Sequence, residues 1–224
     1  MCFSPESSFT AAAVLGVTGV VALRAAGRAR ALPLALVPLL FAAHQFVEGF
    51  TWLEFDSGSA RVLEGGPTIW IYTLIAFVLW PVYIPFAVGM LEPDRRRRRV
   101  IAACGVLGVT ASGYFLVSLL SQTPTAHVLE HGIAYYTHGP WLTEATVPYI
   151  FAAIVPCLVS SIVRLRVVGV IWAISAVLAM VLVNANAFAS TWCFFAAAIS
   201  LTIITVVSAS RDQTDSVQAL PAHV

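Results

Sequence analysis

The residues best suited to chemistry lie close together, because residues 127–138 hold three of the chain's five histidines. On a helix, residues three and four apart share one face. The polar residues with that spacing are His127, Glu130, His131, Tyr135 and His138. The sequence therefore predicts a short amphipathic helix here, with imidazoles and a carboxylate on its polar face.

His127, Glu130 and His131 also match the H-x-x-E-H spacing of inverted zinc proteases, in which the histidines bind zinc and the glutamate is a base. Those enzymes place the motif in a large soluble domain with a distant acidic ligand, so the spacing alone does not indicate a peptidase. The broader expectation is that histidines at i and i+4 share one transition metal, with His138 as a further ligand. The alternative is an interfacial helix whose polar face is exposed to water and binds no metal.

A second pair of ionisable residues, His44 and Glu48, lies inside an apolar stretch. The two residues are one helical turn apart and face the same way. Ionisable groups within a membrane span are costly to bury, so they are functional candidates by default. The alternative is a buried pair whose hydrogen bonds only fix helix packing.

The elements that would position these residues are membrane helices. Hydrophobic residues make up 59% of the chain and charged residues 10%, which indicates that most of it is solvated by a bilayer. Seven apolar stretches come near the ~20 residues needed to cross a ~30 Å hydrocarbon core. They are residues 9–26, 32–52, 69–90, 100–120, 147–163, 167–183 and 192–208. We therefore expect an all-α, seven-helix membrane domain over residues 1–210 and a short polar tail over 211–224.

The arginines predict which side of the membrane each connection faces. Arg61 lies in the acidic connection between residues 52 and 69, and the other arginines are Arg24, Arg28 and Arg30, then Arg95 to Arg99, then Arg164 and Arg166, then Arg211. The sidedness rests on this second group. With seven spans, all of these fall on one side, while the opposite connections are acidic or neutral. Because cytoplasmic loops are rich in basic residues, we expect an outside N-terminus and a cytoplasmic C-terminus.

The basic residues also limit the function. The run from Arg95 to Arg99 is expected to set topology and to contact anionic lipid, and nucleic acid is not expected as a partner because the net charge is only +1. Every basic side chain is arginine, so no lysine is present to form a retinal Schiff base.

This topology gathers the candidate residues on the outer side of the membrane. The predicted metal ligands are His44, His127, His131 and His138, the predicted bases or further ligands are Glu48 and Glu130, and the predicted further cofactor ligands are Cys2 and Cys193. Such N, O and S donors suit zinc, copper or haem iron. Cys2 and Cys193 would alternatively form a disulfide, which an oxidising outer compartment permits.

Two functions remain open from the sequence. In the first, a metal at the outward-facing His/Glu site activates water or carries electrons, with Glu48 or Glu130 as base. In the second, the protein is a non-enzymatic subunit or transporter whose outer polar groups bind a partner or relay protons or ions.

The start Met-Cys-Phe-Ser, followed directly by a membrane helix and then by His44-Gln45 and Glu48-Gly49 on the second helix, resembles a bacterial family of multi-helix membrane proteins that begin in this way. The resemblance implies a multi-pass protein of the bacterial plasma membrane. Whether the protein forms a homo-oligomer or joins a membrane complex is left open by the sequence. The resemblance implies no activity for this protein.

Overall fold

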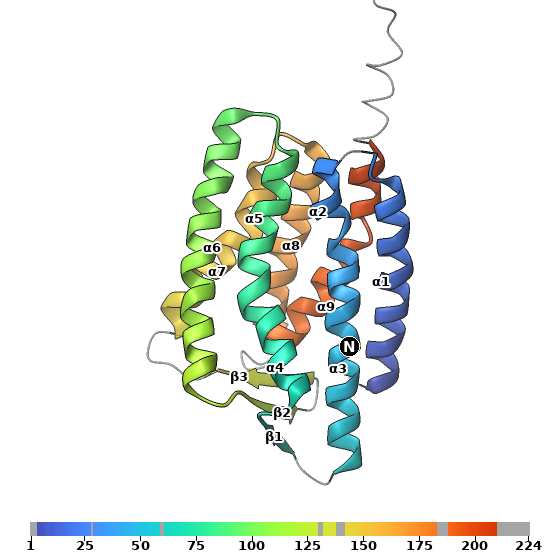
Figure 1. Ribbon diagram of the computed structural model, residues 1–224, viewed down its shortest axis with the longest axis vertical. Coiled ribbons are helices and arrows are strands. Elements are labelled where there is room, and N and C mark those ends of the chain that lie inside the picture. The colour runs from blue at the N-terminus through green and yellow to red at the C-terminus, as the bar shows by residue number, and fades with distance from the viewer. Residues whose placement is uncertain are drawn as a thin grey trace, which may run out of the picture.

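The computed structural model describes residues 4–27, 29–58, 61–129, 132–137, 142–182 and 188–209. Figure 1 shows a bundle of helices with a small β-sheet at one end. The helices are α1 (Pro5–Ala25), α2 (Leu32–Ala35), α3 (Val37–Ser57), α4 (Pro67–Thr73), α5 (Trp80–Leu91), α6 (Arg95–Ser121), α7 (Leu142–Val159), α8 (Val163–Leu182) and α9 (Phe188–Ser200). A 3₁₀ turn (Ala29–Ala31) precedes α2, a π-helical segment (Leu74–Leu79) joins α4 to α5, and residues 203–209 are again helical. The strands are β1 (Val62–Glu64), β2 (Thr125–Leu129) and β3 (Gly132–Tyr136).

The helices confirm the predominantly α-helical expectation, and each of the seven predicted apolar stretches contains helix. Within the described residues, five helical segments are long and apolar enough to cross a membrane. They are Pro5–Ala25, Ala29–Ser57, Pro67–Leu91, Arg95–Ser121 and Ser190–Ala209, and the apolar helix at Glu144–Val159 is shorter.

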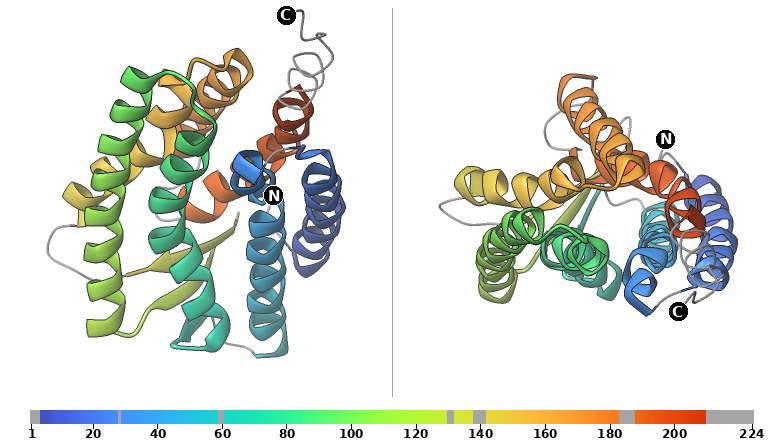
Figure 2. Two further views of the ribbon diagram at one scale, coloured as in Figure 1. Left: turned by 45° about the horizontal axis from the view of Figure 1, so that its top comes forward. Right: turned by 90° about the horizontal axis from the view of Figure 1, so that it is seen from above.

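The helices form two layers, as the view from above in Figure 2 shows. One layer contains α6, α5, α3 and α1, and the other contains α7, α8 and α9. α9 packs against both α8 and α3, so it joins the two layers. The connections α1–α2, α5–α6 and α7–α8 lie at the end of the bundle opposite the sheet. We call these the arginine end and the sheet end, because those connections carry or adjoin Arg24, Arg30, Arg95 to Arg99, Arg164 and Arg166.

The predicted helix over residues 127–138 is wrong, because the described residues of this segment form strands. β2 pairs antiparallel with β3, placing His127 opposite Ala134, and β1 pairs with the other edge of β2, placing Val62 opposite His127. Two physical reasons explain the difference. The segment is rich in β-branched and aromatic residues, which favour strands. Gly132 adopts φ +148°, a value that L-residues rarely reach and that ends any helix.

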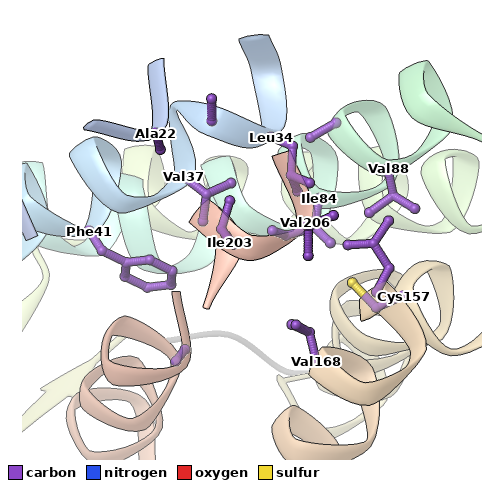
Figure 3. Close-up of a cluster of buried hydrophobic side chains, with 14 of the residues drawn as sticks. Ala22, Leu34, Val37, Phe41, Ile84, Val88, Cys157, Val168, Ile203 and Val206 are labelled. Atoms are coloured by element: carbon purple, nitrogen blue, oxygen red, sulfur yellow. The ribbon is translucent and has the colours of Figure 1, made fainter. Parts of the chain in front are cut away.

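A buried apolar core holds the two layers together (Figure 3). Phe41 of α3, Val88 of α5, Cys157 of α7, Val168 of α8 and Ile203 near the C-terminal end of the described chain all belong to it. The core therefore draws on both layers and fixes α3 and α9 next to each other.

The π-helical segment frees main-chain carbonyls, which neighbouring helices use. The hydroxyl of Tyr149 donates to the carbonyl of Ala76 at 2.8 Å, and the hydroxyl of Ser112 donates to the carbonyl of Val78 at 2.7 Å. Pro81 lies two residues after this segment, and Gly108 of α6 packs so tightly on the Pro81 carbonyl that a Cβ at position 108 would overlap it. These contacts fix the register between α5 and α6.

Candidate functional site

α3 turns a polar stripe toward the interior of the bundle. His44, Gln45 and Glu48 are each 0% exposed, whereas Phe46 and Phe50 on the opposite face are exposed. Spacings of three and four residues explain why the three polar residues share one face. A soluble helix would have the reverse arrangement, so this pattern is typical of a helix whose apolar face meets lipid.

Glu48 joins α3 to α9 through hydrogen bonds to its two carboxyl oxygens. The hydroxyl of Ser190 donates to Oε1 at 2.6 Å, and the side-chain amide of Gln45 donates to Oε2 at 3.1 Å. Ser190 lies 142 residues further along the chain. The first bond is short and has the length of a charge-assisted hydrogen bond. Glu48 is therefore held in a defined position rather than merely enclosed.

Cys193 and Tyr72 complete the cluster around Glu48. Cys193 lies one turn after Ser190, is a free buried thiol, and is close to both the Glu48 carboxyl and the Tyr72 hydroxyl. The cluster thus combines carboxyl, amide, hydroxyl, phenol and thiol groups from α3, α4 and α9. We call His44, Gln45, Glu48, Tyr72, Ser190 and Cys193 the polar cluster.

Aromatic rings connect the polar cluster to the sheet. The ring centroid of Tyr72 lies 4.2 Å from that of His44 and 3.7 Å from that of Tyr135, which stacks on it at an interplanar angle of 10°. Tyr135 belongs to β3, so the β2–β3 hairpin reaches the cluster through a tyrosine.

His44 has few polar neighbours among the described residues. Its ring lies near the main-chain carbonyl of Tyr72, yet neither ring nitrogen makes a well-formed hydrogen bond with any described residue. An unsatisfied buried polar group costs about 1–3 kcal/mol. A proton acceptor, a water molecule or a ligand at His44 would offset that cost.

A small apolar cavity adjoins the polar cluster on the side of the arginine end. It has about 30 Å³ of free space and is lined by Phe41, Trp80, Ile84, Ala153, Trp172, Trp192, Cys193 and Ala196. A space of this size admits one or two water molecules, but an apolar lining gives them few partners. Cys193 lines this cavity and also belongs to the polar cluster. The residues next to the cluster on this side are therefore largely apolar.

The other predicted site residues do not join the cluster in the described part of the chain. His127 contacts its own hairpin, with Nε2 3.4 Å from the Thr125 hydroxyl and its ring edge-on to Tyr136 at 4.8 Å. Four more, Cys2, Glu130, His131 and His138, lie outside the described residues. Among the residues that are described, no group of three or more His, Cys, Asp and Glu side chains is arranged to hold a metal ion. The metal site remains a prediction.

Sequence reasoning missed Glu92, a second buried carboxylate, at the arginine end. Its Oε1 accepts from Ser161 Oγ at 2.6 Å and from the Asp94 main-chain N–H at 3.1 Å. Its Oε2 accepts from Ser160 Oγ and the Ser161 main-chain N–H, both at 2.8 Å. Burial by itself would raise the pKa of Glu92, but these hydrogen bonds outweigh it and hold the pKa below its usual value.

The Glu92 network ties the α5–α6 connection to the α7–α8 connection. Arg97 reinforces it by donating to the carbonyls of Val159 at 2.8 Å and Ser160 at 3.2 Å. No local sequence signal marks Glu92, because a carboxylate just after an apolar stretch is ordinary in a membrane protein. The serine pair that binds it lies 68 and 69 residues away.

Comparisons with known proteins give a family and no function. No curated protein and no solved structure matches the chain. One family model, described as a family of unknown function (DUF6629), matches residues 1–219. Because that match spans nearly the whole chain, including the polar cluster and the Glu92 network, the protein belongs to the DUF6629 family.

Proposed function

We propose that this protein crosses the bacterial plasma membrane seven times, and that Glu48 and His44 take up and release a proton near its outer face. Five helical segments long and apolar enough to span a membrane support the membrane location. The arginine-bearing connections at one end support an outside N-terminus and a cytoplasmic C-terminus, by the positive-inside rule.

The position of the pair along α3 supports an outer site. α3 runs from the arginine end to the sheet end, and Glu48 lies nine residues before its last residue, Ser57. At ~1.5 Å per residue, Glu48 is about 14 Å and His44 about 20 Å from that end. A proton arriving from outside would therefore reach Glu48 first.

The observation that carries the proposal is the state of His44. A fully buried imidazole whose nearest polar neighbour is the Tyr72 main-chain carbonyl is expensive, and stable packing does not require one. Imidazole both accepts and donates protons, and the Glu48 carboxyl one turn away does the same. The Ser190 hydroxyl, which both donates and accepts, stabilises Glu48 in either protonation state.

Infrared difference spectroscopy across a pH titration of the purified protein tests the proton site. Wild type should show the carbonyl band of a buried carboxylic acid that changes with pH, and Glu48→Gln should lose it. Glu54→Gln is the matched control, because Glu54 lies on the same helix nearer the sheet end and is held by Thr68. If Glu48→Gln leaves the pH-difference spectrum unchanged, Glu48 does not exchange a proton and the proposal fails.

The same preparation separates proton exchange from metal chemistry. Elemental analysis and a visible absorption spectrum should detect no stoichiometric metal or haem in wild type. A metal bound at one per chain and lost in His44→Asn would replace the proton site with a metal site. The function would then be hydrolytic or redox chemistry at the same residues.

Topology has its own test. A reporter that is active only in the cytoplasm, fused after Val224, should be active, and a reporter that requires the outer compartment should be inactive at the same position. The opposite result would place the polar cluster near the cytoplasmic face and overturn the direction of proton access.

A further inference from the structure

An apolar groove runs along the outside of the bundle between α5 and α6. Its volume is about 540 Å³, within the range of ligand-binding pockets. α5 lines it with Val82, Pro85, Phe86, Gly89 and Met90, and α6 with Arg98, Ile101, Ala102, Gly105, Val106, Val109 and Thr110. Arg98 is its one charged lining residue.

Two glycines keep the groove hollow. Gly89 and Gly105 have no side chains, so no side chain projects into the groove between α5 and α6 at these positions. A Cβ at Gly105 would lie 3.6 Å from the Cβ of Pro85, which is ordinary contact, so the helices do not require glycine there. The exposed side chains of Phe86 and Val106 form the walls.

The length of the groove matches one leaflet of a bilayer. From Arg98 to Val109 is 11 residues of helix, or about 16 Å at ~1.5 Å per residue. This is close to half of the ~30 Å hydrocarbon core. The groove is thus long enough to hold an acyl chain across one leaflet, and its polar end lies at the arginines.

The charge at that end comes from Arg98 and its neighbours. Arg98 donates through Nε and Nη2 to the Glu92 main-chain carbonyl, at 3.0 and 2.6 Å, which fixes the guanidinium beside the groove. The nearby acids are already engaged, because the Glu92 carboxylate binds the serine pair and Asp94 caps α6 by accepting from the Arg97 N–H. The remaining arginines from Arg95 to Arg99 are exposed. The site is therefore cationic at its polar end and apolar along its length.

We propose that this groove binds one anionic phospholipid, with an acyl chain between α5 and α6 and its phosphate at Arg98. The headgroup must be anionic because several exposed arginines surround Arg98, and each basic residue near a membrane surface favours acidic lipid. A guanidinium binds phosphate oxygens with directed hydrogen bonds. This proposal is independent of the proton site.

Native mass spectrometry with phosphatidylglycerol and phosphatidylcholine tests the proposal. Wild type should retain one phosphatidylglycerol and discriminate against phosphatidylcholine. Arg98→Gln should weaken phosphatidylglycerol binding about fivefold or more. Arg96→Gln is the matched control, because it removes the same charge from the same helix but does not line the groove, and its effect should be clearly smaller than that of Arg98→Gln.

Groove filling provides a test that leaves every arginine in place. Gly105→Leu should abolish retention of the single lipid, and Val106→Trp should do the same from an exposed position that folding tolerates. If both filled variants bind phosphatidylglycerol as wild type does, the groove is not the binding site. If Arg96→Gln weakens binding as much as Arg98→Gln, the arginines attract lipid only by their summed charge. Either result overturns the proposal.

Discussion

Replacing Glu92 by glutamine should destabilise the whole bundle although it changes few atoms. The Glu92 carboxylate uses its two oxygens to accept four hydrogen bonds, and each oxygen receives one main-chain N–H, from Asp94 or from Ser161. Glutamine has one acceptor oxygen, so in either orientation one of these N–H groups loses its partner. That loss costs about 1–3 kcal/mol, and the remaining bonds lose their charge assistance, for roughly 2–4 kcal/mol in all.

The assay is thermal unfolding of detergent-purified protein followed by tryptophan fluorescence. For a chain of this size, roughly 2–4 kcal/mol corresponds to a lowering of the apparent Tm by about 5–15 °C. The matched control is Glu144→Gln, which makes the same chemical change at an exposed position near the start of α7. Its apparent Tm should equal that of wild type.

Acid titration adds a second, independent readout. Because the folded-state pKa of Glu92 lies below its unfolded value of ~4.3, its stabilisation is fully present above that pH and is lost as pH falls through the folded pKa. The difference in apparent Tm between wild type and Glu92→Gln should therefore be constant from pH 7 to about pH 5 and should shrink below about pH 4. If Glu92→Gln and wild type have the same apparent Tm at pH 7, the network does not hold the two connections together.

Three further substitutions test separate contacts by the same unfolding assay. Gly108→Val should lower the apparent Tm by overlap with the Pro81 carbonyl, at about 3 kcal/mol or more, whereas Gly113→Val, with open space around it, should be near neutral. Gly132→Ala should destabilise the hairpin by about 1–3 kcal/mol because its φ of +148° suits only glycine, and added protease should cleave the hairpin sooner. Ser190→Ala should cost about 1.5–3 kcal/mol by removing the 2.6 Å bond to Glu48, and equal stability to wild type would show that this bond is not formed.

The sequence was sufficient to predict the helices because their signal is local. An apolar stretch of membrane-spanning length needs no knowledge of its neighbours, and each of the predicted stretches contains helix. The same holds for His44 and Glu48, because an ionisable residue in an apolar stretch stands out by itself. Both are fully buried on the inward face of α3.

The hairpin could not be predicted in the same way, because its stability comes from a distant partner. β1 lies about sixty residues before β2 and forms the third strand of the sheet, and no local periodicity reports that pairing. His127 and His131 were assigned to one helix face by spacing alone. Residues i and i+4 of a strand are about 13 Å apart, at ~3.3 Å per residue, so this spacing does not bring two side chains together as it does on a helix.

The partners of Glu48 were missed for a related reason. Serine and tyrosine are common in membrane helices, and nothing in their spacing distinguishes Ser190 or Tyr72 from residues that only bond their own helix. Cys193 was identified, but as a ligand or disulfide partner of Cys2. Its closeness to Glu48 and Tyr72 follows from the packing of α9 against α3, which is a tertiary feature.

Tyr72 links the polar cluster to the sheet end of the bundle. Tyr72 lies between His44 and Tyr135, so the path from the sheet end to His44 passes a stack of aromatic rings. Such a pair contributes about 0.5–1.5 kcal/mol beyond its buried area, less than the charge-assisted bond between Ser190 and Glu48. The stack is therefore the weaker of the two contacts, and the bond from Ser190 to Glu48 is the one that ties α3 to α9 more strongly. A proton that reaches His44 from the sheet end, as proposed above, would pass the Tyr72–Tyr135 stack, whereas the space lined by Trp80 and Trp172 beside the cluster is apolar.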